Sequence, residues 1–201
     1  MTSPRVRPRR EDVRAQILEA AIAVFNREGY GAASIQKIAA EAGFTKGAVY
    51  SNFDSKQELF GAIMRARFSE TSLAVLEGIT PTSDGWHSAV GQAATLLARH
   101  IGTLGSLHAL VIEFALQASR DPEAHEVYLE LRRAQRLELA DGLRTRAASL
   151  GLAENIDFDQ VAATILALIS GLTLESIIDP DLPTENIIRD ALLGALTPKR
   201  R

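Results

Sequence analysis

The sequence predicts an all-α fold, and two observations support this prediction. Apolar residues recur every three or four positions through most of the 201 residues, and no segment alternates polar and apolar residues as a strand would. Hydrophobic residues make up 46% of the chain and charged residues 23%, which is the composition of an ordinary globular protein. This length suffices for one large or two small domains.

Three helices are predicted before residue 54. Ile17 and Val24 belong to an apolar face that repeats at helical spacing, and Gly29 ends that first helix. Ser34 is a suitable N-cap for a short second helix, and Gly43 stops it. A third short helix follows, with its N-cap at residue 45 and its end near residue 53.

The remainder of the chain predicts six more helices. Ser55-Lys56-Gln57-Glu58 has the form of a capping box, which opens a long helix toward residue 76. A loop containing Pro81 follows. Later helices are predicted over residues 86–101 and 106–118, from Asp121-Pro122 to about 151, over 157–178, and from near Pro183 to 196.

Charge is unevenly distributed along the chain. The net charge is -3, yet residues 1–67 hold 11 Lys and Arg against 7 Asp and Glu. The acidic excess therefore lies in the remaining 134 residues. A basic first third joined to an acidic body is typical of a small nucleic-acid-binding unit attached to a second functional part.

Residues 34–52 predict a helix-turn-helix, because two short helices flank the turn at 43–45. The second helix would present its N-terminal turn to a major groove. Lys46 can reach guanine O6 and N7, and Asn52 can offer an amide to a base or a phosphate. Small residues would let the backbone approach the bases. The candidate groove residues are Lys46, Gly47, Ala48, Tyr50, Ser51 and Asn52.

Phosphate contacts are expected beside these groove residues. Ser34, Thr45 and Lys56 cluster near predicted helix N-termini, where backbone N–H groups also favour phosphate, and Tyr50 has a suitable hydroxyl. The alternative interpretation is that all these residues are solvated polar side chains on a small helical bundle.

Residues 33–53 and 55–59 resemble the DNA-binding signature of the tetracycline-repressor (TetR) family, with many positions matching in register. The sequence departs from that signature at Phe44 and at Ser51-Asn52, and the second departure bears on the operator sequence. The resemblance implies a nine-helix regulator that binds operator DNA. It also implies that Gln36 reaches a base from the first helix of the motif.

The same resemblance divides the chain into three parts. These would be a flexible basic arm (residues 1–10), a helix-turn-helix domain (11–54) and a ligand-binding and dimerisation domain (55–201). The arm carries four arginines that could add phosphate or minor-groove contacts, namely Arg5, Arg7, Arg9 and Arg10.

A homodimer is expected from the last two predicted helices. The helix over 159–178 is apolar around much of its circumference, so one packing surface cannot bury it. Two such helices from each subunit would form a four-helix interface. The candidate interface residues are Leu168, Gly171, Leu172, Ile188 and Leu192. Burial of both helices within one subunit is the alternative.

An unidentified small-molecule effector is expected in the larger domain. Polar groups on the otherwise apolar helix 107–117 must be satisfied by neighbours or by a bound molecule. The candidates are Trp86, His108, Glu113, Phe114, Gln117 and Tyr128. Each could equally be a satisfied core or surface residue. Arg132, Arg133 and Arg136 interleave with glutamates and indicate a solvated helix face.

Other functional classes lack support in the sequence. The absence of cysteine excludes disulfides and thiolate metal sites, and the four histidines have no metal-ligand spacing. We see no phosphate loop or nucleophile elbow, and therefore expect no enzyme, no cofactor and no metal. The apolar runs 107–116 and 165–174 are shorter than a membrane span, so we expect a cytoplasmic protein.

The sequence thus predicts a repressor that binds a palindromic operator as a dimer. A small apolar or amphipathic effector would release it from the operator. A regulator controlled by a protein partner, or acting without a ligand, is the alternative.

Overall fold

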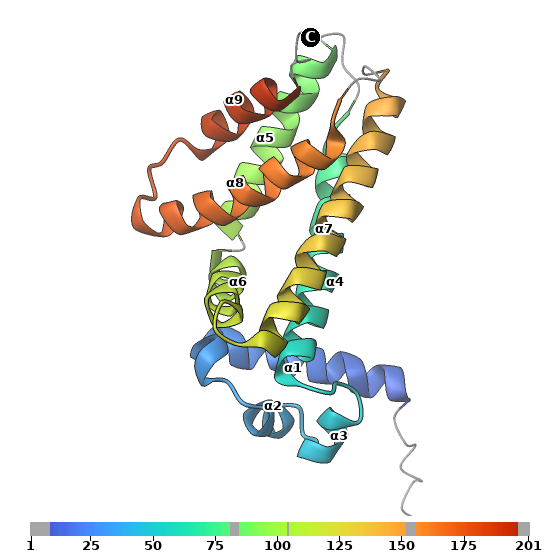
Figure 1. Cartoon of the computed structure of the whole chain (residues 1–201), viewed down its shortest axis with the longest axis vertical. Coiled ribbons are helices and arrows are strands. Elements are labelled where there is room, and N and C mark those ends of the chain that lie inside the picture. Colours follow the sequence, from blue (N-terminus) through green and yellow to red (C-terminus); the bar gives the residue numbers. More distant parts are fainter. Residues whose placement is uncertain (1–8, 81–84, 104, 152–155, 197–201) are drawn as a thin grey trace, which may run out of the picture.

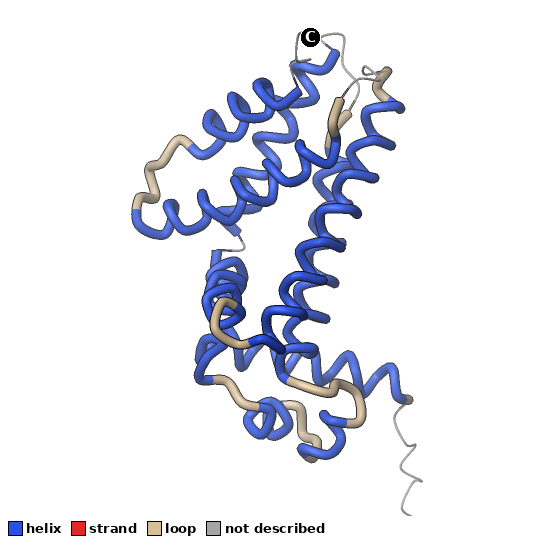
Figure 2. Tube along the Cα trace, in the orientation of Figure 1, coloured by secondary structure: helices blue, strands red, loops and turns tan. Residues whose placement is uncertain are grey.

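The structure is a computed structural model that describes residues 9–80, 85–103, 105–151 and 156–196, apart from the side chains of residues 86, 103, 105 and 106. The described residues form helices and no strand (Figure 2), so the all-α prediction is confirmed. In chain order these helices are α1 (Arg10–Ala32), α2 (Ile35–Glu41), α3 (Lys46–Tyr50), α4 (Lys56–Gly78), α5 (Gly85–Thr103), α6 (Gly105–Ala118), α7 (Pro122–Ser149), α8 (Phe158–Ile178) and α9 (Thr184–Leu196).

The helices form two regions along the long axis of the molecule (Figure 1). α1, α2 and α3 lie at one end, while α5, α8 and α9 lie toward the other. The long helices α4 and α7 run side by side between the ends, and α6 lies where the two regions meet. Any signal between the two ends must therefore pass through α4, α6 or α7.

Side-chain caps set the starts of the helices in the small region. The hydroxyl oxygens of Ser34, Thr45 and Ser55 each accept the backbone N–H three residues on, at 3.1 to 3.3 Å. The three predicted N-caps are thus confirmed. The predicted capping box forms only in part, because Glu58 accepts the N–H of Asp54 at 2.5 Å.

Two helix ends are defined by the backbone. Gly29 has a φ of 79°, which interrupts α1 where the sequence predicts its end. α3 is shorter than predicted and ends at Tyr50. The N–H groups of Asn52 and Phe53 both donate to the Val49 carbonyl at 3.0 Å, so the chain closes in a tight turn there.

The first hydrophobic core joins the small region to the long helices. Its centre is a group of aromatic rings with neighbouring centroids 4.8 to 5.9 Å apart. The rings come from α1 (Phe25, Tyr30), α4 (Phe60), α6 (Phe114) and α7 (Tyr128). We call these five residues the aromatic cluster. Because one core spans both regions, α1 cannot move independently of α6.

A second core fills the opposite end and is built from α5, α7, α8 and α9. It contains Leu172, Ile188 and Leu192, which are 7%, 1% and 3% exposed. The sequence assigned these three residues to a subunit interface. They instead pack within one chain, because α8 and α9 contact each other and both contact α5.

The apolar part of helix α8 is longer than the uninterrupted apolar run at residues 165–174. An 18-residue window of this 21-residue helix reaches a mean hydropathy of 2.0, which by length and composition would be enough to cross a membrane. The expectation that the apolar segments fall short of a span is therefore wrong for this helix. One third of the apolar window is buried against neighbouring helices, so much of its apolar surface faces outward.

Tyr30 generates a stability prediction. Its side chain is fully buried, burial raises the pKa of its phenol, and its hydroxyl has no hydrogen-bond partner in the described part of the chain. An unsatisfied buried hydroxyl costs about 1–3 kcal/mol. Tyr30→Phe should therefore leave the free energy of unfolding unchanged or raise it by about 1 kcal/mol in urea denaturation.

Tyr30→Ala is the matched comparison. It opens a cavity inside the aromatic cluster and should lower the free energy of unfolding by about 3–5 kcal/mol. A large loss of stability in Tyr30→Phe would show that the hydroxyl has a hydrogen-bond partner in the folded protein.

Candidate functional site

α3 projects from the small region with one face buried and the other exposed. Val49 and Phe53 are 0% and 1% exposed and hold the helix against the first core. Lys46, Gly47 and Tyr50 lie on the opposite, exposed face. The geometry is that of a short helix presented for docking into a groove, as the helix-turn-helix pattern predicts.

The exposed residues differ in how freely they can reach DNA. Gln36 on α2 is exposed, and Ala48 is half-buried. The Lys46 ammonium lies 5.6 Å from the Tyr50 ring centroid, within cation–π range. Lys46 and Tyr50 therefore form a joint surface at the exposed face of α3, while Ser34 and Thr45 mainly serve as helix caps.

Asn52 is turned toward its own helix rather than toward solvent. Its side-chain nitrogen donates to the Ala48 carbonyl at 2.9 Å and to Ser51 Oγ at 3.3 Å. The Ser51 hydroxyl also donates to the Ala48 carbonyl, at 2.8 Å. These bonds satisfy the end of α3, a role that the sequence did not predict for Ser51 or Asn52.

The basic arm enters the described chain at Arg9. Arg10 donates from Nη2 to the Ser51 carbonyl at 3.3 Å, which places its guanidinium beside α3. Arg9 is exposed. Arg5 and Arg7 lie outside the described residues.

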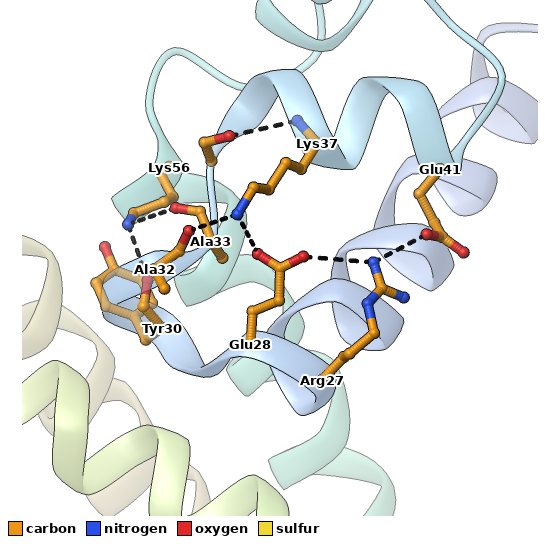
Figure 3. A network of polar contacts seen from close by, with 9 residues as sticks. Arg27, Glu28, Tyr30, Ala32, Ala33, Lys37, Glu41 and Lys56 are labelled. Atoms are coloured by element: carbon orange, nitrogen blue, oxygen red, sulfur yellow. Dashed lines mark hydrogen bonds and ion pairs between the residues drawn. The ribbon is translucent and has the colours of Figure 1, made fainter.

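Charged pairs tie α2 to the end of α1 (Figure 3). The Lys37 ammonium lies 2.6 Å from a carboxylate oxygen of Glu28, and this bond lowers the pKa of that carboxyl. Arg27 lies 3.5 Å from Glu28 and 3.1 Å from Glu41. The sequence gives no direct sign of these pairs, because the partners meet only when α2 folds back on α1.

Lys56 has partners inside the protein. Its ammonium donates to the carbonyls of Tyr30 at 2.9 Å and Ala33 at 3.0 Å, and it lies 4.3 Å from the Tyr30 ring centroid (Figure 3). Burial lowers the pKa of this amine. Lys56 thus caps the carbonyl end of α1, where the sequence anticipated a phosphate contact. An ammonium has three N–H donors, so one remains after these two bonds.

Glu113 and Phe114 contact the small region. Glu113 Oε2 accepts the Tyr30 backbone N–H at 2.8 Å. A Cβ added at Gly29 would meet the same carboxylate at 3.0 Å, which is one reason why glycine suits this position. Phe114 and Tyr128 belong to the aromatic cluster. These three candidate ligand residues join α6 and α7 to α1, and their contact with a ligand stays a prediction.

A separate cavity of about 100 Å³ lies between α4, α5, α6, α7 and α8. His108 lines this cavity as the sequence predicted, and Gln117 does not. The side chain of Trp86 lies outside the described residues. Most of the lining is aliphatic, and the polar lining groups include Ser72, His100, Arg132 and Gln135.

The sequence missed the cavity residues on α7. Arg132 was assigned to a solvated face, but it is half-buried and donates to Gln135 Oε1 at 3.3 Å. Positions 132, 135, 139 and 143 all line the cavity, and their spacing of three or four residues marks one helix face. Only the packing of α4 on α7 reveals that this face is covered.

An exposed apolar stripe runs along α8. It consists of Ala163, Ala167, Gly171, Leu174 and Ile178, which repeat every three or four residues and are all exposed. Leu174 and Ile178 are 48% and 78% exposed. Gly171 lies within this stripe, whereas Leu168 is only half exposed beside it. A continuous apolar face on one helix is typical of an interaction surface.

Comparisons with known sequences agree with this geometry. Residues 17–63 match the sequence model of bacterial regulatory proteins of the tetR family. Residues 106–197 match that of the C-terminal part of BetI-type transcriptional repressors. Together the two matches cover more than half of the chain.

Individual relatives are similar over different lengths. The HTH-type transcriptional regulator YfiR of Bacillus subtilis is 31% identical over 131 residues, or 65% of this chain, and the match spans 63% of YfiR. A second relative of this chain is HdnoR of Paenarthrobacter nicotinovorans, a nicotine-responsive transcriptional repressor. It is 26% identical over 92% of this chain and 93% of its own length.

A solved structure shows the same fold. FadR of Bacillus subtilis in complex with stearoyl-CoA is 19% identical and superposes with a TM-score of 0.62, covering 92% of this chain and 99% of FadR. These relatives are transcriptional regulators and not enzymes. The sequence matches, the exposed recognition helix and the shared architecture lead to one conclusion: the chain is a helix-turn-helix transcriptional regulator of the TetR family.

Proposed function

We propose that this regulator is a repressor that binds a palindromic operator as a homodimer, and that a small amphipathic molecule releases it. The DNA-binding claim of this proposal rests on α3, which has one face exposed and the other packed against the first core. Lys46 and Tyr50 face outward while Val49 is completely buried. Because the fold already holds this helix in place, it can enter a groove without a further entropic cost of ordering on binding.

In the proposed dimer the two subunits, each with its own α3, would pair through the apolar stripe of α8. Two subunits paired through that stripe would bury Leu174 and Ile178, which a single chain leaves exposed. A two-fold symmetric pair presents two recognition helices to half-sites about 34 Å apart. A palindromic operator, with its two symmetric half-sites, is the target that suits this arrangement. The protein would act in the cytoplasm.

Ligand control is supported by the position of α6. Leu107, His108 and Val111 on this helix line the cavity. Glu113, less than one turn further on, accepts the Tyr30 N–H, and Phe114 lies in the aromatic cluster. A ligand that displaces α6 would therefore also displace the end of α1 and with it α2 and α3. By linkage, operator and ligand must weaken each other equally.

The names of two relatives are consistent with such control. HdnoR is described as nicotine-responsive, and the FadR structure holds stearoyl-CoA. These ligands differ widely from each other, so they support a small-molecule effector without identifying it.

Lys46 tests base reading. Lys46→Ala should relax the preference at one base position per half-site by about 1–3 kcal/mol, because a lysine contact to guanine discriminates by that amount. The measurement is operator selection followed by fluorescence anisotropy with each single-base variant. A uniform loss over all variants would instead assign Lys46 to the phosphates.

Lys56 distinguishes a structural role from a phosphate contact. Lys56→Met keeps the aliphatic stem over Tyr30 but removes both hydrogen bonds to the carbonyls of Tyr30 and Ala33. Since these groups are partly buried, we expect the free energy of unfolding to fall by about 1–3 kcal/mol. Lys46→Met, on an exposed face, should leave stability unchanged and serves as the control.

The salt dependence of operator binding completes this comparison. A lost phosphate contact shallows the slope of log K against log salt by about one unit. If Lys56→Met shows that change at unaltered stability, the capping role described above is wrong.

Gly171 tests the dimer. A side chain at this position would meet no atom within 4 Å in the single chain, so Gly171→Arg should fold and should slightly favour the helix. At a two-fold interface it would bury two like charges together. We expect monomers by light scattering and loss of operator binding. Ala134→Arg, on an exposed face of α7, should remain dimeric; an intact Gly171→Arg dimer would move the interface elsewhere.

A further inference from the structure

The cavity is elongated, and we call it the slot. Along α4 its lining extends from Met64 to Ile79, which is about 22 Å at 1.5 Å per residue. An elongated lining of this kind suits an extended chain better than a compact ring system.

The polar groups gather at one end of this slot. α4 and α7 run in the same direction, since Gly61 lies against Val127 near their starts and Gly142 against Leu76 near their ends (Figure 1). On α7 the polar lining residues Arg132 and Gln135 come first. They are followed by leucines at 139 and 143. On α4 the polar lining residues lie at 67, 71 and 72, with the apolar Met64 and Phe68 beside them, and only aliphatic residues follow at 75, 76 and 79.

α5 repeats this division. α5 runs against α4, because Leu96 lies beside Gly78 at the end of α4. Its lining residue Ala93 therefore lies at the aliphatic end, and His100 lies toward the polar end. His108 of α6 is 5.7 Å from His100 between ring centroids. α4, α5 and α7 thus place their polar lining groups toward α1 and only aliphatic ones away from it.

The ionisable groups at the polar end are all bases. Among the described residues that line the slot, the ionisable side chains are Arg67, Arg132, His100 and His108, with no Asp or Glu. Arg67 is paired with Glu70 at 3.0 Å. Arg132 has no carboxylate within 4.0 Å in the described chain, and its recorded hydrogen bond is to the neutral amide of Gln135. A half-buried guanidinium placed in this way favours an anionic partner.

We propose that the effector is an amphipathic anion, a carboxylate or similar acid on a slender aliphatic chain, with its head at Arg132 and its tail directed toward Ala93. This rests on the proposed ligand control and names the chemical class of the ligand. A cationic amphipath would face Arg132 without a counter-charge, and a neutral one would leave the guanidinium unused.

The test compares three probes of equal chain length by isothermal titration calorimetry with the full-length protein. These are dodecanoate and dodecyltrimethylammonium, each below its micelle concentration, and dodecanol below its solubility limit. Dodecanoate should bind at one molecule per chain, and the cation about tenfold or more weaker. Equal or tighter binding of the cation would overturn the proposal, as would failure of all three to bind.

Two variants locate the head and the tail. Arg132→Gln should weaken dodecanoate about tenfold and leave dodecanol unchanged, while Arg133→Gln, an exposed neighbour with the same charge change, should alter neither. Ala93→Trp should block the aliphatic end, so that octanoate binds more tightly than dodecanoate. Equal effects of Arg132→Gln and Arg133→Gln, or an unchanged chain-length preference in Ala93→Trp, would refute the orientation.

Because binding is measured without DNA, this test is separate from that of the proposed repressor. A protein that binds operator but prefers the cation would contradict only the ligand class. A protein that binds dodecanoate but no DNA would contradict only the repressor.

Discussion

The contact between α6 and the end of α1 is the constraint on which the rest of this structure depends. Gly29 breaks α1 and leaves the Tyr30 N–H without a helical partner, and Glu113 supplies an acceptor at 2.8 Å. Tyr30 then enters the aromatic cluster beside Phe60 and Phe114. Through this contact the DNA-binding helices share a hydrophobic core with the helix that lines the cavity. This shared core is the physical route by which the proposed ligand control would act.

Lys56 and Lys37 also hold the end of α1 in place. Lys56 binds the carbonyls of Tyr30 and Ala33, and Lys37 binds Glu28 and the Ala32 carbonyl (Figure 3). The exposed carbonyl end of α1 is thus satisfied by two ammonium groups, which favourably oppose the negative end of a helix dipole. These bonds fix α2, and hence α3, relative to α1.

Local sequence signals were sufficient for most of the fold. Caps at Ser34, Thr45 and Ser55 and the stop at Gly29 act within a few residues, so their pattern is visible in the chain itself. Contacts between distant residues were not visible. Nothing local distinguishes Glu113, which binds the Tyr30 N–H 83 positions earlier in the chain, from a ligand-binding carboxylate. The same holds for Arg132, whose helix face becomes a cavity wall only when α4 covers it.

Amide hydrogen exchange at Tyr30 tests the central contact most directly. If Glu113 joins the two regions, Glu113→Ala should accelerate exchange of the Tyr30 amide, and of the Ala33 amide that bonds to Gly29. Amides of α8, which lies in the second core, should exchange as in the original protein. Unchanged protection at Tyr30 in Glu113→Ala would contradict the account, since the end of α1 would then be held without α6.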